Sequence, residues 1–256
     1  MKIDDLNIAS ARRLATLLFP HLMGWIRNQF FVPQIGPHHK EGAFLGEHLK
    51  LAIENLKKAF AGEIMATNQQ IRTLITEMIT KGEEVNSEII CYLMLHDIGK
   101  VDRLLITTGS VKEVEVPWNA WALQNPELGT KDGKFLWMEE EVTRVSYFHP
   151  SKGPLSQHGA WGAEIIARDA VPKERFADII KVISIHENGY MFEKENPGQM
   201  ENMVIKHNLS DRQLKLFIAC TYLDASASEK ENGADMSRFM NLANSYLTYM
   251  AQQQTA

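Results

Sequence analysis

The chain has 256 residues, of which 45% are hydrophobic and 23% charged, and its formal net charge is −5. This composition is that of a globular protein with a sizeable core, and the acidic balance argues against a broad nucleic-acid-binding surface without excluding a local basic groove. The two cysteines, Cys91 and Cys220, lie in apolar stretches and are expected to be buried thiols. With no leader pattern and no apolar run of transmembrane length, we expect a cytoplasmic protein and no membrane partner.

The first hundred residues are dominated by helical spacing. Residues 10–31 predict one helix that ends before Pro33. In 48–60 and again in 87–97, apolar residues recur on one helical face. We therefore interpret residues 1–35 as a helical extension that precedes the first core helix.

Glycines and prolines interrupt the helical pattern between 106 and 157. Val111, Val114 and Val116 predict at most a short strand in this region. Irregular stretches of this length in compact proteins are often lids or binding loops. We interpret 106–157 as an excursion between core helices and not as a separate domain.

Helical patterns return in the last hundred residues. Pro172 can open a helix whose buried face lies within 176–183. Ser210 begins a capping box at the start of a further helix, which leads to Asp224. The predicted fold class is therefore all-α: one domain, 1–256, built as a helical bundle whose excursion has room for a short β-hairpin.

Five of these helices carry potential metal ligands at an inner or terminal position of an apolar stripe: His48, His96 with Asp97, His158, His186 and Asp224. A helical bundle can bring such groups together in its core. Unpaired, they would be costly to bury, and a shared divalent cation removes that cost. Nitrogen and carboxylate ligands favour Mn, Fe, Co, Ni or Zn over Ca.

The same positions lie in short motifs that occur in a fixed order. After His48 come HDIGK at 96–100, HGAWGAEII at 158–166, ISIHENGY at 183–190 and ACTYLDAS at 219–226. This series resembles the H…HD…D signature of the HD superfamily of metal-dependent phosphohydrolases. The resemblance covers roughly 38 to 228 and implies an HD-domain helical bundle.

What the resemblance implies about the site is specific. The four signature residues would hold a first metal, and two further histidines a second, with the Asp of the HD pair as the bridge. On this chain the first set is His48, His96, Asp97 and Asp224, and the second adds His158 and His186. The implied cofactor is two divalent transition-metal ions.

The implied reaction is hydrolysis of a phosphomonoester or phosphodiester, with a small phosphorylated substrate such as a nucleotide. Asp97 would bridge the metals and position the attacking hydroxide. Lys100 follows HDIG at a place where members of the family often contact a substrate phosphate. The alternative for Lys100 is an exposed lysine at a helix C-terminus, where the helix dipole favours it.

Other classes of function stay open. The stretch GPHHKEGAFLGEH at 36–48 resembles HD-type 3′-to-5′ exoribonucleases and the HD region of some conjugative relaxases, which act on nucleic acid. A catalytically silent HD module that binds a ligand or regulates a partner is the other alternative. The run HENGY at 186–190 lacks the His-His-Glu and Gly-Tyr-Pro elements of the HD-GYP cyclic-di-GMP phosphodiesterases, so the resemblance does not extend to a third metal.

Several individual residues also have two interpretations. His149 competes with His158 for the same role, although the spacing after His158 fits the family better. Glu187 could orient His186, contact metal-bound water, or be a solvated turn residue. His38 and His39 could join the site or lie at the surface, and three tryptophans of the excursion could stack on a base or simply pack: Trp118, Trp121 and Trp137.

Overall fold

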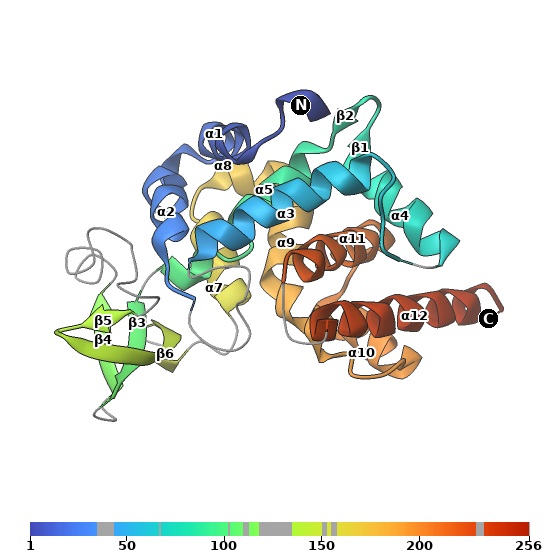
Figure 1. Cartoon of the computed structure of the whole chain (residues 1–256). Coiled ribbons are helices and arrows are strands. Elements are labelled where there is room, and N and C mark those ends of the chain that lie inside the picture. Colours follow the sequence, from blue (N-terminus) through green and yellow to red (C-terminus); the bar gives the residue numbers. More distant parts are fainter. Residues whose placement is uncertain are drawn as a thin grey trace.

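The computed structural model describes residues 1–34, 44–66, 68–101, 103–109, 113–117, 135–149, 153–154, 158–228 and 233–255. Helices make up the body of the protein, and a small sheet lies at one end (Figure 1). The α-helices are α1 (Ile8–Leu18), α2 (Met23–Asn28), α3 (Leu45–Phe60), α4 (Gln69–Ile79), α5 (Ser87–Leu95), α7 (His158–Ile166), α8 (Ala170–Arg175), α9 (Ala177–Ile185), α10 (Pro197–His207), α11 (Asp211–Ala227) and α12 (Ala234–Thr255). Short 3₁₀ turns lie between them: η1 (Ile3–Asp5), η2 (Pro20–Leu22), η3 (Gln29–Phe31), η4 (Ile98–Val101) and η5 (His186–Met191).

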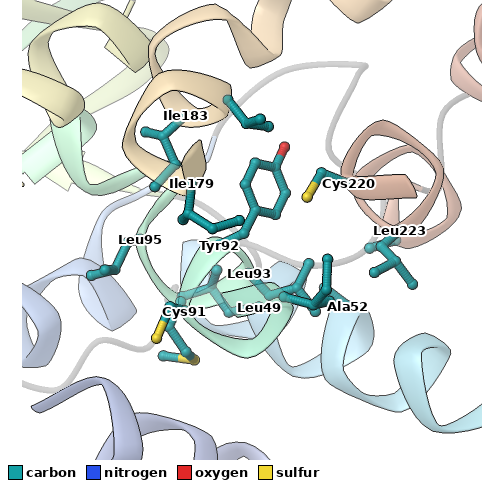
Figure 2. Close-up of a cluster of buried hydrophobic side chains, with 14 of the residues drawn as sticks. Leu49, Ala52, Cys91, Tyr92, Leu93, Leu95, Ile179, Ile183, Cys220 and Leu223 are labelled. Carbon is teal, nitrogen blue, oxygen red and sulfur yellow. The ribbon is translucent and has the colours of Figure 1, made fainter. Parts of the chain in front are cut away.

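Helix α5 forms the centre of the core. Its residues from Ile89 to Leu95 are all buried, and the side chain of Asn86 caps its first turn. Helices α3, α9 and α11 pack around it, and their apolar side chains surround Tyr92 (Figure 2). Because α5 is buried from Ile89 to its last residue, His96 and Asp97, which follow it, lie in the interior.

The N-terminal extension is helical but broken, so the expectation of one helix over 10–31 was wrong. Helix α1 ends at Leu18, and η2 begins at Pro20. Proline has no backbone N–H and its ring clashes with the preceding turn, so the helix cannot run through it. Farther along, the side-chain amide of Gln29 donates a hydrogen bond to the Met94 carbonyl at 2.7 Å, which fastens this segment to α5.

The described part of the excursion forms an antiparallel sheet together with the residues just before it, and this overturns the all-α prediction. Its strands run in the order β4-β3-β6-β5, with β7 paired to β6. They are β3 (Arg103–Thr108), β4 (Glu113–Pro117), β5 (Leu136–Trp137), β6 (Glu140–His149) and β7 (Gly153–Pro154). A second ribbon pairs β1 (Thr80–Lys81) with β2 (Glu84–Val85). The described chain is therefore a helical bundle with two sheets.

Alternation along β3 explains the larger sheet. Leu104, Ile106 and Thr108 are buried while the residues between them are only partly so, which is the pattern of a sheet with one packed face. Across the pair with β4, Leu104 lies opposite Val116 and Ile106 opposite Val114. The predicted strand at 111–116 corresponds to β4 as far as the described residues reach.

The C-terminal part confirms one local prediction and adds two helices. Ser210 and Gln213 form the expected capping box at the start of α11. Helices α10 and α12, which the sequence analysis did not predict, pack against each other. Within the described residues, none of the helices has both the length and the apolar character needed to cross a membrane.

Candidate metal centre

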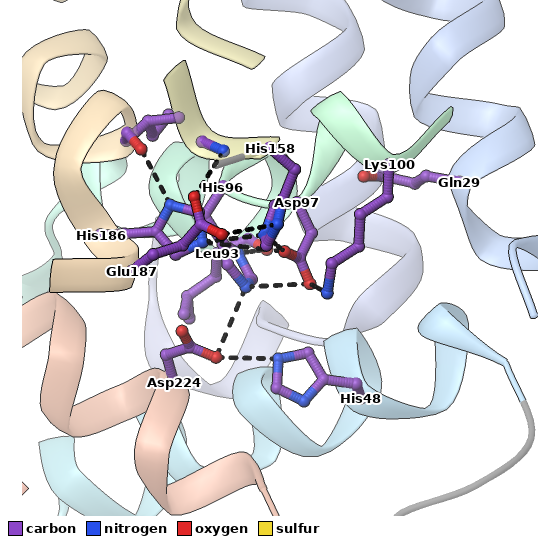
Figure 3. Close-up of polar contacts among 12 residues, drawn as sticks. Gln29, His48, Leu93, His96, Asp97, Lys100, His158, His186, Glu187 and Asp224 are labelled. Carbon is purple, nitrogen blue, oxygen red and sulfur yellow. Dashed lines mark hydrogen bonds and ion pairs between the residues drawn. The ribbon is translucent and has the colours of Figure 1, made fainter. Parts of the chain in front are cut away.

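All six predicted ligands converge at the inner ends of their helices (Figure 3). Five of them line one cavity of about 270 Å³, and His96 lies behind it. They form two groups in which one ligand atom of each residue lies within 4.8 Å of the others: His48, His96 and Asp224; Asp97, His158 and His186. These two buried groups could hold metal ions.

His96 and His186 are oriented by the same device. Each follows directly after a helix, α5 or α9, and each ring Nδ1 lies close to the carbonyl three residues earlier, at 3.2 Å from Leu93 and 2.8 Å from Ile183. A carbonyl only accepts hydrogen bonds, so Nδ1 must carry the proton. The Nε2 of each ring therefore points to the centre of the site, where its lone pair is available to a metal once that nitrogen is unprotonated.

Asp97 lies between the two groups and faces both. Its Oδ1 is 2.7 Å from His158 Nε2 and 3.8 Å from His186 Nε2. Its Oδ2 is 3.5 Å from His96 Nε2 and 2.8 Å from Lys100 Nζ. One carboxylate oxygen therefore faces each group, which is the arrangement a bridging ligand needs.

The first group contains a buried nitrogen without a hydrogen bond. His96 Nε2 lies 3.5 Å from Asp97 Oδ2 and 3.5 Å from Asp224 Oδ1 and forms a hydrogen bond to neither. On the other side of the group, His48 Nε2 lies 3.0 Å from Asp224 Oδ1. A cation among these atoms would give the buried nitrogen a partner, so the donor set fits a nitrogen- and oxygen-binding divalent metal.

Glu187 orients His158, not His186 as we had considered. Its Oε1 lies 2.9 Å from His158 Nδ1, and its Oε2 accepts a hydrogen bond from the Gly159 backbone N–H at 3.1 Å. A carboxylate on one ring nitrogen fixes the ring and makes the other nitrogen a better metal ligand. Glu187 thus acts on the site through His158.

Three glycines let α7 approach closely enough to bring His158 to the site. A Cβ atom on Gly99 would lie 2.1 Å from the His158 carbonyl oxygen, and one on Gly162 would lie 3.2 Å from the Gly99 nitrogen. A Cβ on Gly159 would lie 2.5 Å from His186 Nδ1. Glycine at these positions is therefore a condition for the geometry of the second group.

Lys100 is buried, which excludes the interpretation as an exposed lysine at a helix end. It is 8% exposed, and its ammonium lies 2.8 Å from Asp97 Oδ2 and 5.4 Å from the centroid of the Tyr147 ring. Burial lowers the pKa of Lys100, but Asp97 and Tyr147 outweigh that effect and raise it, so the group stays charged. It is a fixed positive charge at the wall of the cavity.

The pKa shifts separate the ligands by charge: the two aspartates stay anionic, His96 favours its cationic form and His186 its neutral form. Burial raises the pKa of Asp97 and of Asp224, but the cationic neighbours, Lys100 and His96 respectively, hold both carboxyls well below their ordinary range. Burial lowers the pKa of His96, while Asp97 and Asp224 raise it to about 9. For His186, burial and the neighbouring histidines lower the pKa to about 4. Protons on His96 thus occupy a place that a metal ion could take.

Tyr190 is a site residue that the sequence analysis missed. It hydrogen-bonds Asp224, and burial together with that carboxylate raises the pKa of Tyr190 well above its ordinary value. The phenol therefore stays neutral and donates to Asp224. Gln34 and Asp235 were also missed, although both are buried and line the cavity. Each stands alone in an otherwise unremarkable stretch, so no motif marked them.

The remaining candidates lie elsewhere. His21 pairs with Asp169 at 3.5 Å, and the ring of His207 lies 3.2 Å from the side-chain amide of Asn188. Trp137 is buried in β5. His149 is in β6, but its side chain is not among those described, and four other candidates lie outside the described residues: His38, His39, Trp118 and Trp121.

The fold and the site together define a protein with a helical body, two small sheets and a buried centre, lined by histidine and aspartate, that could bind metal. Comparison of the chain with protein families, characterised proteins and solved structures finds no match. What this protein does must therefore be argued from the centre itself.

Proposed function

We propose that this protein is a metal-dependent phosphohydrolase that acts on a phosphomonoester or phosphodiester, with a nucleotide as the favoured substrate class. One observation carries the proposal: Asp97 belongs to one of two buried ligand groups through its Oδ1, and its Oδ2 faces His96 of the other group. The resemblance of the ordered motifs to the HD superfamily supports the same reaction.

The proposed cofactor is a pair of divalent transition-metal ions, drawn from Mn, Fe, Co, Ni and Zn. The first would be held by His48, His96, Asp97 and Asp224, and the second by Asp97, His158 and His186. When bound, such ions lower the pKa of water from 15.7 to about 7 and stabilise charge on the entering and leaving oxygens.

The protein's own residues supply orientation and charge. Asp97 directs one carboxylate oxygen toward each ligand group, while Glu187 fixes the orientation of the His158 ring. Tyr190 performs the same task for Asp224. Lys100 provides a cation that can neutralise a non-bridging oxygen of the substrate phosphate.

The substrate phosphate would compete with Asp97 for Lys100. The ammonium is already buried and held within 2.8 Å of a carboxylate, so it pays little additional desolvation when it turns to another oxyanion. A divalent ion on Asp97 would offset the loss of the lysine. We therefore infer that metal binding and phosphate binding support each other.

The test is hydrolysis of bis(p-nitrophenyl) phosphate and p-nitrophenyl phosphate by the wild type and by Asp97→Asn, with Mn²⁺, Fe²⁺, Co²⁺, Ni²⁺ or Zn²⁺ added in turn. Asp211→Asn is the matched control, because Asp211 is an exposed aspartate that pairs with Lys215 on α11. We expect metal-dependent turnover in the wild type and control, and a loss of about 10²–10³-fold in Asp97→Asn. Turnover that does not depend on Asp97, or none with any of the five metals, would contradict the proposal.

A further inference from the structure

The wall of the cavity contains polar residues that belong to neither ligand group. Gln34 and Asp235 are 4% and 2% exposed, and both line the same cavity of about 270 Å³ as the candidate ligands. Ser228, just after α11, lines it as well. The proposed hydrolysis does not use these three residues, which raises the question of what they contact.

Backbone contacts hold Gln34 in place, but its side-chain amide oxygen accepts no hydrogen bond from the described residues. The residue before it, Pro33, forms an antiparallel bridge with Phe44, and the Leu45 N–H donates to the Val32 carbonyl at 2.9 Å. These contacts fix Gln34 beside the start of α3. Within the described part of the chain its Oε1 is buried without a hydrogen-bond partner. A buried acceptor of this kind is costly unless something in the cavity donates to it.

Asp235 provides a second acceptor with a partly balanced charge. It lies in the first turn of α12, where the helix dipole favours a carboxylate, and the Arg238 guanidinium lies 3.9 Å away. The dipole and the arginine offset part of the cost of burying it. The carboxylate also lines the cavity that holds the candidate ligands, where a substrate group can reach it.

The polar groups that line the cavity are therefore of two kinds, a cation and hydrogen-bond acceptors. Among the described lining residues other than histidines, Lys100 is the cation, and it suits a phosphate. Gln34 and Asp235 offer acceptors, which suit neutral hydroxyl donors. Arg238 lies 3.9 Å from Asp235, so a hydroxyl donor can meet this carboxylate without a further full cation.

We propose that Gln34 and Asp235 form a hydroxyl-binding subsite, so that the substrate is the phosphate ester of a sugar, with its ring hydroxyls donating to these two residues. The inference rests on the proposed function for the phosphate half of the substrate. A cavity of about 270 Å³ lies just below the ~300–1,000 Å³ typical of pockets for drug-sized ligands. It has room for a phosphate and one sugar ring.

The first experiment measures binding without turnover. Adenosine 5′-monophosphate and its 2′,3′-dideoxy analogue, which lacks both ring hydroxyls, are titrated into the protein in EDTA by calorimetry. We expect the wild type to bind the hydroxylated nucleotide about tenfold to a hundredfold more tightly. Asp235→Ala should bring that ratio close to one, and Gln34→Leu should lower it severalfold if Asp235→Ala fails to fold. The control is Glu201→Gln, an exposed acid on α10, which should keep the ratio.

The second experiment repeats the comparison as kcat/KM with Mn²⁺ present. A hydroxyl preference that Asp235→Ala abolishes, in binding and in turnover, supports the subsite. Equal affinity for the two nucleotides, a preference unchanged in both variants, or no binding of either nucleotide would overturn it. If the preference is found but neither nucleotide is hydrolysed, the phosphohydrolase assignment fails and the subsite stands. If both nucleotides are hydrolysed without preference, the phosphohydrolase assignment stands and the subsite fails.

Discussion

Replacing Gly99 by alanine should force α7 away from the turn that carries Asp97. The new methyl carbon would lie 2.1 Å from the His158 carbonyl oxygen and 2.9 Å from the Gly162 nitrogen, and real Cβ atoms essentially never come closer than 3.0 Å. The backbone contact must therefore open by about 1 Å. His158 begins α7, so its Nε2 would move away from Asp97 Oδ1, from which it is now 2.7 Å distant.

The expected cost has two parts. Overpacking destabilises the fold by about 1–3 kcal/mol, which for a chain of this size lowers Tm by roughly 2–12 °C. A displacement of about 1 Å at a catalytic group costs on the order of 10²-fold in rate. The assays are thermal unfolding and Mn²⁺-dependent hydrolysis of bis(p-nitrophenyl) phosphate, measured well below the Tm of the variant.

Two other glycines provide matched controls. A Cβ on Gly162 would come no closer than 3.2 Å to any atom, so Gly162→Ala should have a smaller effect on both measurements. A Cβ on Gly24 in α2 would meet nothing within 4 Å, so Gly24→Ala should leave the rate unchanged and keep or raise Tm. If Gly99→Ala matched the wild type in rate and metal affinity, the reasoning from close packing would be refuted.

Two further predictions concern the candidate metal site, and a third concerns the buried cysteines of the core. Glu187→Gln should weaken metal binding about 10–100-fold without changing the secondary structure, because the neutral amide no longer holds the His158 ring as a charged acceptor. A metal titration measures the affinity, and circular dichroism checks the secondary structure. Wild-type affinity in the variant would contradict the prediction. Metal binding at pH 7 should release at least one proton, because the pKa of His96 is raised to about 9 without metal and the ring must lose a proton to bind. Calorimetry in buffers of different ionisation enthalpy measures this release. Identical heats of binding in these buffers would count against the prediction. Both thiols should resist iodoacetamide at pH 8 in the folded protein, because burial raises the pKa of Cys91 to about 12 and that of Cys220 well above its ordinary value. Rapid labelling without denaturant would show that this part of the core is open to the reagent.

The convergence of the ligands could be anticipated from the sequence because each one ends or lines an apolar helix. His96 and Asp97 follow a run that is buried from Ile89 onwards, so their position in the interior follows from the packing of α5. His186 follows the buried stripe of α9 in the same way. Helical periodicity thus carries information about where a polar residue at the end of a stripe must lie.

The sheet could not be anticipated in this way, because its pairing is not local. Strand β6 pairs with β3 across more than thirty residues, with Leu104 opposite Tyr147. Alternation within β3 is short, and the glycines and prolines around it are equally typical of an irregular loop. The sequence locates the break in helical pattern, whereas the partner of each strand is decided only by the tertiary fold.

The contacts of single polar residues were likewise beyond the sequence. Glu187 follows His186 directly, yet it contacts His158, which is 28 residues away, because neighbouring residues on a 3₁₀ turn point in different directions. Gln34 and Asp235 lie about two hundred residues apart along the chain and share one cavity only in the folded protein. No spacing rule connects residues that meet in this manner.

The central claim is that the two ligand groups bind metal, and the most direct measurement is the metal content of the protein. The wild type is loaded with Mn²⁺, freed of excess metal by gel filtration, and assayed by mass spectrometry of the elements alongside Asp97→Asn. We expect close to two ions per chain in the wild type and a clear loss in the variant. One ion per chain would contradict the bridged pair, and a content near zero would contradict the metal centre.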